Sequence, residues 1–239
     1  MPVFQLTQRL VFPPPHHSDP DGLLAIGGDL SPERLLLAYR QGIFPWYSAE
    51  TPPLWWSPDP RLVLFLNDLK VSKSLQRVLK KNFFKVTLDR AFLEVIQGCA
   101  EVRRRCGQGT WILPEMIEAY HLLHRLGYAH SVESWLDGTL VGGLYGVAIG
   151  RVFFGESMFT RKTDASKVAL VRLVQLLRYW GFELIDCQVS TSHLQSLGAR
   201  EIPRDEFLNH LAGAIHEGTH CGSWSGAFET IQQDTHRGF

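Results

Sequence analysis

The fold is decided between residues 129 and 159, where the chain reads AHSVESWLDGTLVGGLYGVAIGRVFFGESMF. Apolar side chains dominate this stretch, and its β-branched and aromatic residues favour strands over helices. Asp137-Gly138 is a dipeptide preferred in two-residue type I′ hairpin turns, and Ile149-Gly150 provides a second turn. The sequence therefore predicts consecutive antiparallel strands at 129–136, 139–148 and 151–159.

A helix and a further strand follow these strands. Asp164 or Ser166 begins the helix, and Gly181 ends it. The apolar run Leu184-Ile185-Asp186-Cys187-Gln188-Val189 then predicts a strand. Elements in this order predict the α+β class, with a mixed, mainly antiparallel sheet. The order is similar to that in the later half of a GNAT-like N-acyltransferase domain.

The first sixty residues are of a different kind. Ser31-Pro32-Glu33 has the residues of a helix start, with Ser as N-cap and Pro at the first helical position. Five prolines then interrupt residues 43–61, which we interpret as a rigid aromatic connector without a regular helix or central strand. We predict a small N-terminal domain at 1–60 and a GNAT-like catalytic domain at 61–239. The tail after Gly218 has few apolar residues, so we expect it to be flexible.

The composition is that of a globular protein in a reducing compartment. Of the 239 residues, 45% are hydrophobic and 20% are charged, and the net charge is +0. This neutrality removes global basicity as an argument for nucleic-acid binding, although local patches remain open. The 4 cysteines show no CxxC spacing. With neither a signal peptide nor a membrane-spanning run in the sequence, we expect a cytoplasmic monomer without membrane contact.

Acidic and amide side chains interrupt two of the apolar strands. Asp186 and Gln188 are two residues apart, so a regular strand places both on one face and Ile185 on the other. Glu156 lies in the strand at 151–159. Because an ionised carboxylate is costly to bury without a partner, these residues predict a cleft that handles a polar group. The alternatives are structural: Asp186 caps the next segment or bridges a buried Arg, and Glu156 accepts from backbone amides.

Two tryptophans are candidates for stacking on a nucleobase. Trp46 lies in the proline-rich connector, and Trp111 follows the flexible segment Gly107-Gln108-Gly109. The alternative for the connector tryptophans is that they hold the small domain against the large one.

A local group of basic residues departs from the overall neutrality. Four of them share one side of a predicted helix opposite its apolar residues: Lys73, Arg77, Lys80 and Lys81. Together with Arg103-Arg104-Arg105 they are suited to contact the phosphate backbone of a nucleic acid. The alternative is that they only form a solvated face. Zinc-ligand spacing, phosphate loops and dinucleotide fingerprints are absent from the sequence, so we expect no metal and no cofactor.

Long, irregular motifs occur in order along the chain. They are GLLAIGGDLSP at 22–32, GIFPW at 42–46, WWSPDPR at 55–61, GTWI at 109–112, GESMF at 155–159 and LIDCQV at 184–189. Together they resemble the bacterial leucyl/phenylalanyl-tRNA–protein transferase family, over roughly residues 12–207. Chance is a poor explanation for motifs of this length in this order.

The resemblance implies an aminoacyltransferase without cofactor. Its partners would be aminoacyl-tRNA (Leu-tRNA or Phe-tRNA) and proteins with an N-terminal Arg or Lys. Leu, Phe or, less readily, Met would be transferred to that residue, which marks the protein for degradation. The resemblance also implies a GNAT-like domain preceded by a small N-terminal domain.

The resemblance also assigns residues by motif. Trp46 and Trp111 would hold the 3′-terminal adenosine, with Tyr39 and Tyr120 nearby. The basic helix would contact the acceptor stem. The pocket for the amino-acid side chain, or its surroundings, would contain Leu144, Phe153, Glu156 and Ile185.

The implied chemistry needs little activation. An aminoacyl ester is already reactive, so catalysis consists largely of placing a neutral α-amine against the ester carbonyl. The pKa of a free α-amino group is about 7.7–8.0. Our hypothesis is that Asp186 deprotonates the amine while Gln188 fixes Asp186 or the substrate. The rival is that Asp186 only positions the amine and the terminal ribose hydroxyl shuttles the proton.

Two other functions are compatible with parts of the sequence. The first is a CoA-dependent acetyltransferase, which would hold the CoA pyrophosphate in a Gly-rich turn before the long helix. Residues 160–166 read TRKTDAS at this place, without glycine, which argues against CoA. The second is a non-catalytic RNA-end-binding module, which would have no need of Asp186 and Glu156 in a cleft.

Overall fold

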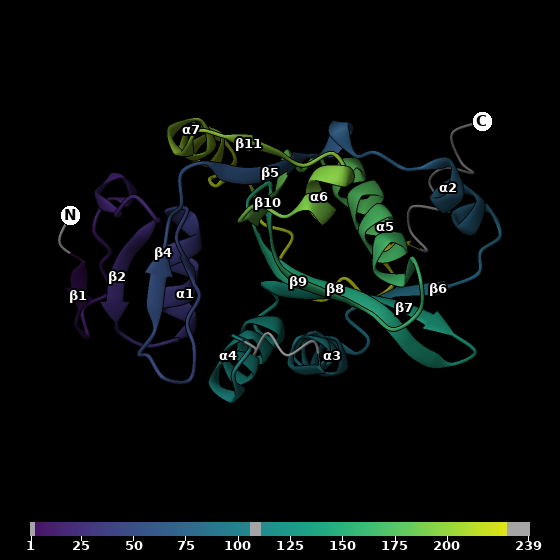
Figure 1. Ribbon diagram of the computed structural model, residues 1–239, viewed down its shortest axis with the longest axis horizontal. Helices are drawn as coiled ribbons and strands as arrows, with labels where there is room; N and C mark the ends of the chain where they lie inside the picture. The colour runs from purple at the N-terminus through teal and green to yellow at the C-terminus, as the bar shows by residue number, and fades with distance from the viewer. Residues whose placement is uncertain (1–2, 106–110, 229–239) are drawn as a thin grey trace.

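The computed structural model describes residues 3–105 and 111–228 and contains a large and a small sheet (Figure 1). The large sheet has the strand order β11-β5-β10-β9-β8-β7-β6. Its strands are β5 (Arg61–Phe65), β6 (Lys85–Leu88), β7 (Ala129–Leu136), β8 (Thr139–Ile149), β9 (Val152–Thr160), β10 (Leu184–Gln188) and β11 (Arg200–Ile202). All neighbours are antiparallel except β9 and β10, which are parallel.

The predicted centre of the sheet is confirmed. Strands β7, β8 and β9 pair in sequence order, and Asp137 and Gly138 both have positive φ, at 50° and 76°, as a type I′ turn requires. Helix α5 (Ala165–Tyr179) and the parallel strand β10 follow. The α+β class and the GNAT-like order of strands, helix and strand are therefore confirmed.

Helices cover both faces of the large sheet (Figure 1). Helices α3 and α4 lie on one face, and α5 and α6 lie on the other. The bounds are α2 (Lys73–Lys80), α3 (Phe92–Arg105), α4 (Pro114–Arg125), α6 (Ser192–Ser196) and α7 (Arg204–Ala214), with short 3-10 turns at Pro15–His17 and Leu66–Asp68. One apolar core lies between α5 and the sheet, and a second continues from α3 and α4 into the small sheet.

The small sheet contains a central strand that we did not predict. Its order is β1-β2-β4-β3, with β1 (Phe4–Leu6), β2 (Leu23–Gly27), β3 (Phe44–Pro45) and β4 (Leu54–Trp56), and α1 (Pro32–Arg40) lies beside it. The prediction that residues 43–61 hold no central strand is wrong, because the prolines flank β4 and none interrupts it. Trp55 in β4 is fully buried, and its Nε1–H donates to the Gly27 carbonyl at 2.8 Å. The division of the chain at Pro60 stays a prediction.

The described part of the C-terminal tail contacts the core through a few apolar residues. Trp224 has only 3% of its surface exposed, and its backbone N–H donates to Asp89 at 2.7 Å. Ala227 and Phe228 are partly buried against the core that contains α5. The composition of the tail did not suggest these contacts, and its flexibility stays a prediction. Among the described residues, no helix is long and apolar enough to cross a membrane.

Candidate active site

A cavity of about 350 Å³ lies between the large sheet, α5 and the small sheet. Its walls are mostly apolar, and a cavity of this volume can hold an apolar side chain. They include Phe44, Pro45 and Trp46 of the small sheet, Leu144 and Tyr145 of β8, Phe153, Glu156 and Met158 of β9, Leu170 and Leu173 of α5, Ile185 and Gln188 of β10, and Trp111.

The cavity opens where two parallel strands part. The pairing of β9 with β10 runs from Val152 opposite Leu184 to Phe154 opposite Asp186 and then stops. Beyond that point, the residues after Phe154 and after Asp186 line the cavity from both sides. The parting exposes backbone and side chains of both strands to the same space, and this explains why polar residues follow apolar runs here.

The prediction that Asp186 and Gln188 share a face is wrong. Strand β10 is irregular between them, and Gln188 has a left-handed backbone with φ of 65°. This irregularity turns the Gln188 side chain toward the cavity, which Ile185 and Cys187 also line. Asp186 is not among the lining residues, and its side chain is fully buried.

Asp186 forms a two-pronged ion pair with a buried arginine. Arg61 Nε donates to Oδ1 at 2.8 Å and Nη2 donates to Oδ2 at 2.7 Å, and both side chains are fully buried. Oδ1 also accepts the Gln188 backbone N–H at 3.0 Å. Asp186 therefore bridges a buried Arg, which is the structural alternative to a role in the cleft. Arg61 was not predicted as its partner, although an arginine that begins an apolar strand signals a buried cation needing an acid.

Arg61 also connects the two sheets. Its Nη1 donates to the Gly42 carbonyl at 3.1 Å, and the guanidinium lies 4.8 Å from the ring centre of Phe44 and 4.6 Å from that of Phe207. Phe44 lines the cavity together with Pro45 and Trp46, and Gly42 lies two residues before it in the chain. The ion pair therefore holds the aromatic wall and the Gln188 turn in one arrangement.

Glu156 is the centre of a second buried polar cluster. Oε1 accepts from the Tyr39 hydroxyl and from Gln188 Nε2, each at 2.8 Å, and Oε2 accepts from the Tyr120 hydroxyl at 2.8 Å. Burial raises the pKa of Glu156 to about 7, although these hydrogen bonds lower it in part. Burial, together with the charge of Glu156, raises the pKa of both tyrosines, so their hydroxyls stay protonated.

Both protonation forms of Glu156 are populated near neutral pH, because its pKa of about 7 lies close to that pH. The hydroxyls of Tyr39 and Tyr120 contact each other as well as Glu156. In its charged form Glu156 accepts from both hydroxyls, and in its protonated form it can donate one proton to the cluster.

The tryptophans lie at different depths. Trp46 is 42% exposed at the cavity, with the ring of Trp56 5.8 Å away and the Trp56 Nε1–H donating to its carbonyl at 2.6 Å. Trp111 lines the cavity too and is partly buried. The segment Gly107-Gln108-Gly109 lies outside the described residues. Tyr39 and Tyr120 contact the cavity residue Glu156 from behind, while Leu144, Phe153 and Ile185 line it directly.

The basic residues lie at the far end of the molecule. Helix α2 begins after the N-cap Ser72 and packs through Leu75 near α5, at the end opposite the small sheet (Figure 1). Its basic side chains are all exposed: Lys73, Arg77, Lys80 and Lys81. The side chains of Arg103-Arg104-Arg105 lie outside the described part of the chain.

The strand order, the long helix α5 and the parting of β9 and β10 define a GNAT-like fold. Comparisons with known proteins narrow this class. The family model described as leucyl/phenylalanyl-tRNA protein transferase matches residues 63–212, and the model of its N-terminal domain matches residues 28–59. The chain belongs to the leucyl/phenylalanyl-tRNA–protein transferase family.

Curated relatives carry the same name over nearly the whole chain. The leucyl/phenylalanyl-tRNA–protein transferase of Syntrophobacter fumaroxidans is 70% identical over 226 residues, covering 95% of this chain and 97% of its own. That of Desulforapulum autotrophicum is 57% identical over 224 residues, covering 94% and 98%.

Similar solved structures are more distant. An aminoglycoside acetyltransferase from a soil metagenomic sample, in complex with sisomicin, matches 48% of this chain and 84% of its own, at 14% identity and a TM-score of 0.38. The L-PGS of Bacillus licheniformis matches 71% and 54%, at 14% identity and a TM-score of 0.39.

Proposed function

We propose that this protein transfers Leu, Phe or, less readily, Met from aminoacyl-tRNA to the N-terminal Arg or Lys of an acceptor protein. The observation that carries the proposal is the apolar cavity bordered by Trp46, Trp111 and the Glu156–Gln188 pair, in a chain of this family. The product would be a substrate for degradation. We place the protein in the cytoplasm as a monomer, in line with the free cysteines Cys99, Cys187 and Cys221.

The two sheets would contribute different parts of the site. We propose that residues 1–60 form the domain that supplies Trp46, and that residues 61–239 form the catalytic domain. The exposed face of Trp46 and the partly buried Trp111 offer stacking surfaces for the 3′-terminal adenosine. Leu144, Phe153 and Ile185 would then surround the aminoacyl side chain in the apolar part of the cavity.

Gln188 is the group that we assign to the attacking amine. Its Nε2 donates to Glu156, so the carbonyl oxygen of the same amide is left as an acceptor for an amine N–H at the cavity. Asp186, bound to Arg61 and to the Gln188 N–H, would hold this turn in place. Of the roles considered for Asp186, we therefore propose positioning rather than proton abstraction.

The proposal predicts transfer from tRNA and not from CoA. Incubation with radiolabelled Phe-tRNA and an acceptor protein that begins with Arg is expected to label the acceptor, whereas acetyl-CoA with the same acceptor is expected to leave it unlabelled. The matched control is the same acceptor beginning with Gly. Labelling from acetyl-CoA alone would favour an acetyltransferase, and tRNA binding without any transfer would favour an RNA-end-binding module.

The basic face of α2 is expected to strengthen tRNA binding without affecting the transfer reaction. Replacing Lys80 and Lys81 together by Gln removes two exposed charges and is expected to reduce the slope of log K against log salt by about 1.4–1.8 for Phe-tRNA. Binding of a short aminoacyl-adenosine mimic should not change. Replacing Arg90 and Arg125 by Gln, also exposed but on other elements, is the matched control. Equal losses for tRNA and mimic would refute an acceptor-stem contact at α2.

A further inference from the structure

The C-terminal segment returns across the sheet and is tied down along its length. The Gly150 N–H donates to Thr219 Oγ1 at 2.9 Å, and the Gly222 N–H donates to the Gly127 carbonyl at 3.0 Å. Trp224 follows, with its Nε1–H donating to the His220 carbonyl at 2.9 Å. These bonds fix the indole beside His130 of β7 and Phe153 of β9, in the core that contains α5.

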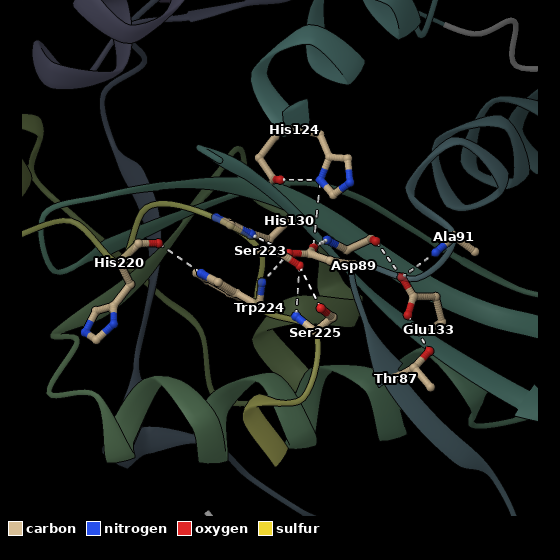
Figure 2. A network of polar contacts seen from close by, with 12 residues as sticks. Thr87, Asp89, Ala91, His124, His130, Glu133, His220, Ser223, Trp224 and Ser225 are labelled. Carbon is tan, nitrogen blue, oxygen red and sulfur yellow. Dashed lines mark hydrogen bonds and ion pairs between the residues drawn. The ribbon is translucent and has the colours of Figure 1, made fainter. Parts of the chain in front are cut away.

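Asp89 is the anchor of this arrangement (Figure 2). It accepts the Trp224 N–H at 2.7 Å, the Ser131 N–H at 2.9 Å and His130 Nδ1 at 2.9 Å. Because a carboxylate only accepts, Nδ1 of His130 carries the proton. The His130 ring stacks on the Trp224 indole with centroids 3.6 Å apart and planes 7° apart.

Trp224 also lies close to a residue that lines the cavity. The ring of Phe153 lies 6.0 Å from Trp224, is 1% exposed and lines the cavity. Gly146 backs the same ring, because a Cβ atom placed there would lie 2.5 Å from it. The position of the Phe153 ring, and with it the depth of the cavity, thus depends on Gly146 and Trp224.

We propose that Trp224, held by Asp89 and His130, is a positioning residue that sets the preference between Leu and Phe by backing the ring of Phe153. The proposal rests on the proposed function for the identity of the two substrates. Trp224 acts through Phe153 and does not line the cavity itself. A smaller side chain at 224 leaves room for the ring to retreat, which deepens the pocket in favour of the larger aminoacyl group.

The first test is the substrate preference of Trp224→Leu. The ratio of kcat/KM for Phe-tRNA to that for Leu-tRNA is expected to rise about three- to tenfold, up to the low end of the discrimination that one methylene gives in an apolar pocket. Trp224→Phe, which keeps a ring and is milder for folding, should give a smaller rise. Trp135→Leu is the matched control, because Trp135 is partly buried on β7 but does not line the cavity. A ratio unchanged in both Trp224 variants would overturn the proposal.

The second test asks whether the effect passes through Phe153. In a Phe153→Leu background, Trp224→Leu is expected to leave the ratio unchanged, since the ring that it backs is gone. The same multiplicative change in both backgrounds would overturn the proposal. Dissociation constants of phenylalanyl- and leucyl-adenosine amides provide a readout that needs no transfer. If the wild type binds them but transfers neither amino acid, the proposed function fails while the Trp224 effect is still measured.

Discussion

Asp186→Leu is expected to lower the free energy of unfolding by about 3–5 kcal/mol, the cost of leaving one member of a buried ion pair unpaired. The side chains of Asp186 and Arg61 are both fully buried, and Arg61 donates two hydrogen bonds to this carboxylate. Without it, the partners left to the guanidinium among the described residues are the Gly42 carbonyl and the two aromatic rings. Urea unfolding of the variant and the wild type measures the difference.

A double variant tests whether Arg61 and Asp186 stabilise the protein as a pair. Arg61→Met with Asp186→Leu replaces both charges by apolar side chains of similar size, so much of the lost stability is expected to return. A double variant as unstable as the sum of the single ones would show that the two residues do not act as a pair.

Asp186→Asn distinguishes positioning of Gln188 from proton abstraction as the role of Asp186. Asp186→Asn keeps the size of the side chain and an oxygen that accepts the Gln188 N–H, but it cannot take up the amine proton. If Asp186 only positions Gln188, single-turnover transfer from saturating Phe-tRNA should stay within about tenfold of the wild-type rate, a smaller loss than the about 10²–10⁴-fold that a general base contributes. A loss of about 10²–10⁴-fold in a folded variant would restore the base hypothesis.

The regular parts of the fold could be predicted because local chemistry determines them. The hairpin at Asp137-Gly138, the meander around it and the helix ending at Gly181 all depend on turn residues and periodicity within a few positions. Strand β4 could not be predicted because the prolines on either side of it argue against a strand, and the pairing with β2 that makes it central is non-local. The same holds for Trp224, whose anchor Asp89 is 135 residues away in the sequence.

Several of the predicted residues line the cavity, but their arrangement could not be predicted. Gln188 and Ile185 both line it, although a regular strand would place them on opposite faces, and Asp186 lies away from it. The difference arises from a single irregularity in β10, where the backbone of Gln188 is left-handed. Glutamine is not a residue type that signals such a backbone, and the cause lies in the contacts of the turn with Asp186 and Glu156.

Glu156 is expected to make the stability of the protein fall as the pH rises toward neutrality. Burial raises its pKa from 4.5 to about 7, so the folded state favours the protonated form. The stabilisation is fully present below pH 4.5 and is lost as the pH rises through about 7, because the unfolded chain releases the proton first. The full difference across this window is on the order of 3 kcal/mol.

Glu156→Gln isolates this contribution, because Gln has a similar shape and does not titrate. The free energy of unfolding of the wild type minus that of the variant is expected to decrease between pH 4.5 and about 7 and to be flat outside that range. Urea unfolding at several pH values measures it, and the titration of other groups cancels in the difference. A difference that is constant from pH 4 to 8 would mean that Glu156 does not change its protonation in that range.

Tyr39→Phe tests how a hydrogen bond to Glu156 affects the pKa of this carboxyl group. The Tyr39 hydroxyl donates to Oε1 of Glu156 at 2.8 Å, and this bond favours the charged carboxylate and lowers its pKa. Removing it is expected to raise the pKa of Glu156 further, so the upper end of the window moves to higher pH. Tyr47→Phe removes a hydroxyl that contacts Glu115 instead, and it should leave the window unchanged. A window that moves equally in both variants would assign the shift to a general loss of packing and not to the cluster of Glu156 with the two tyrosines.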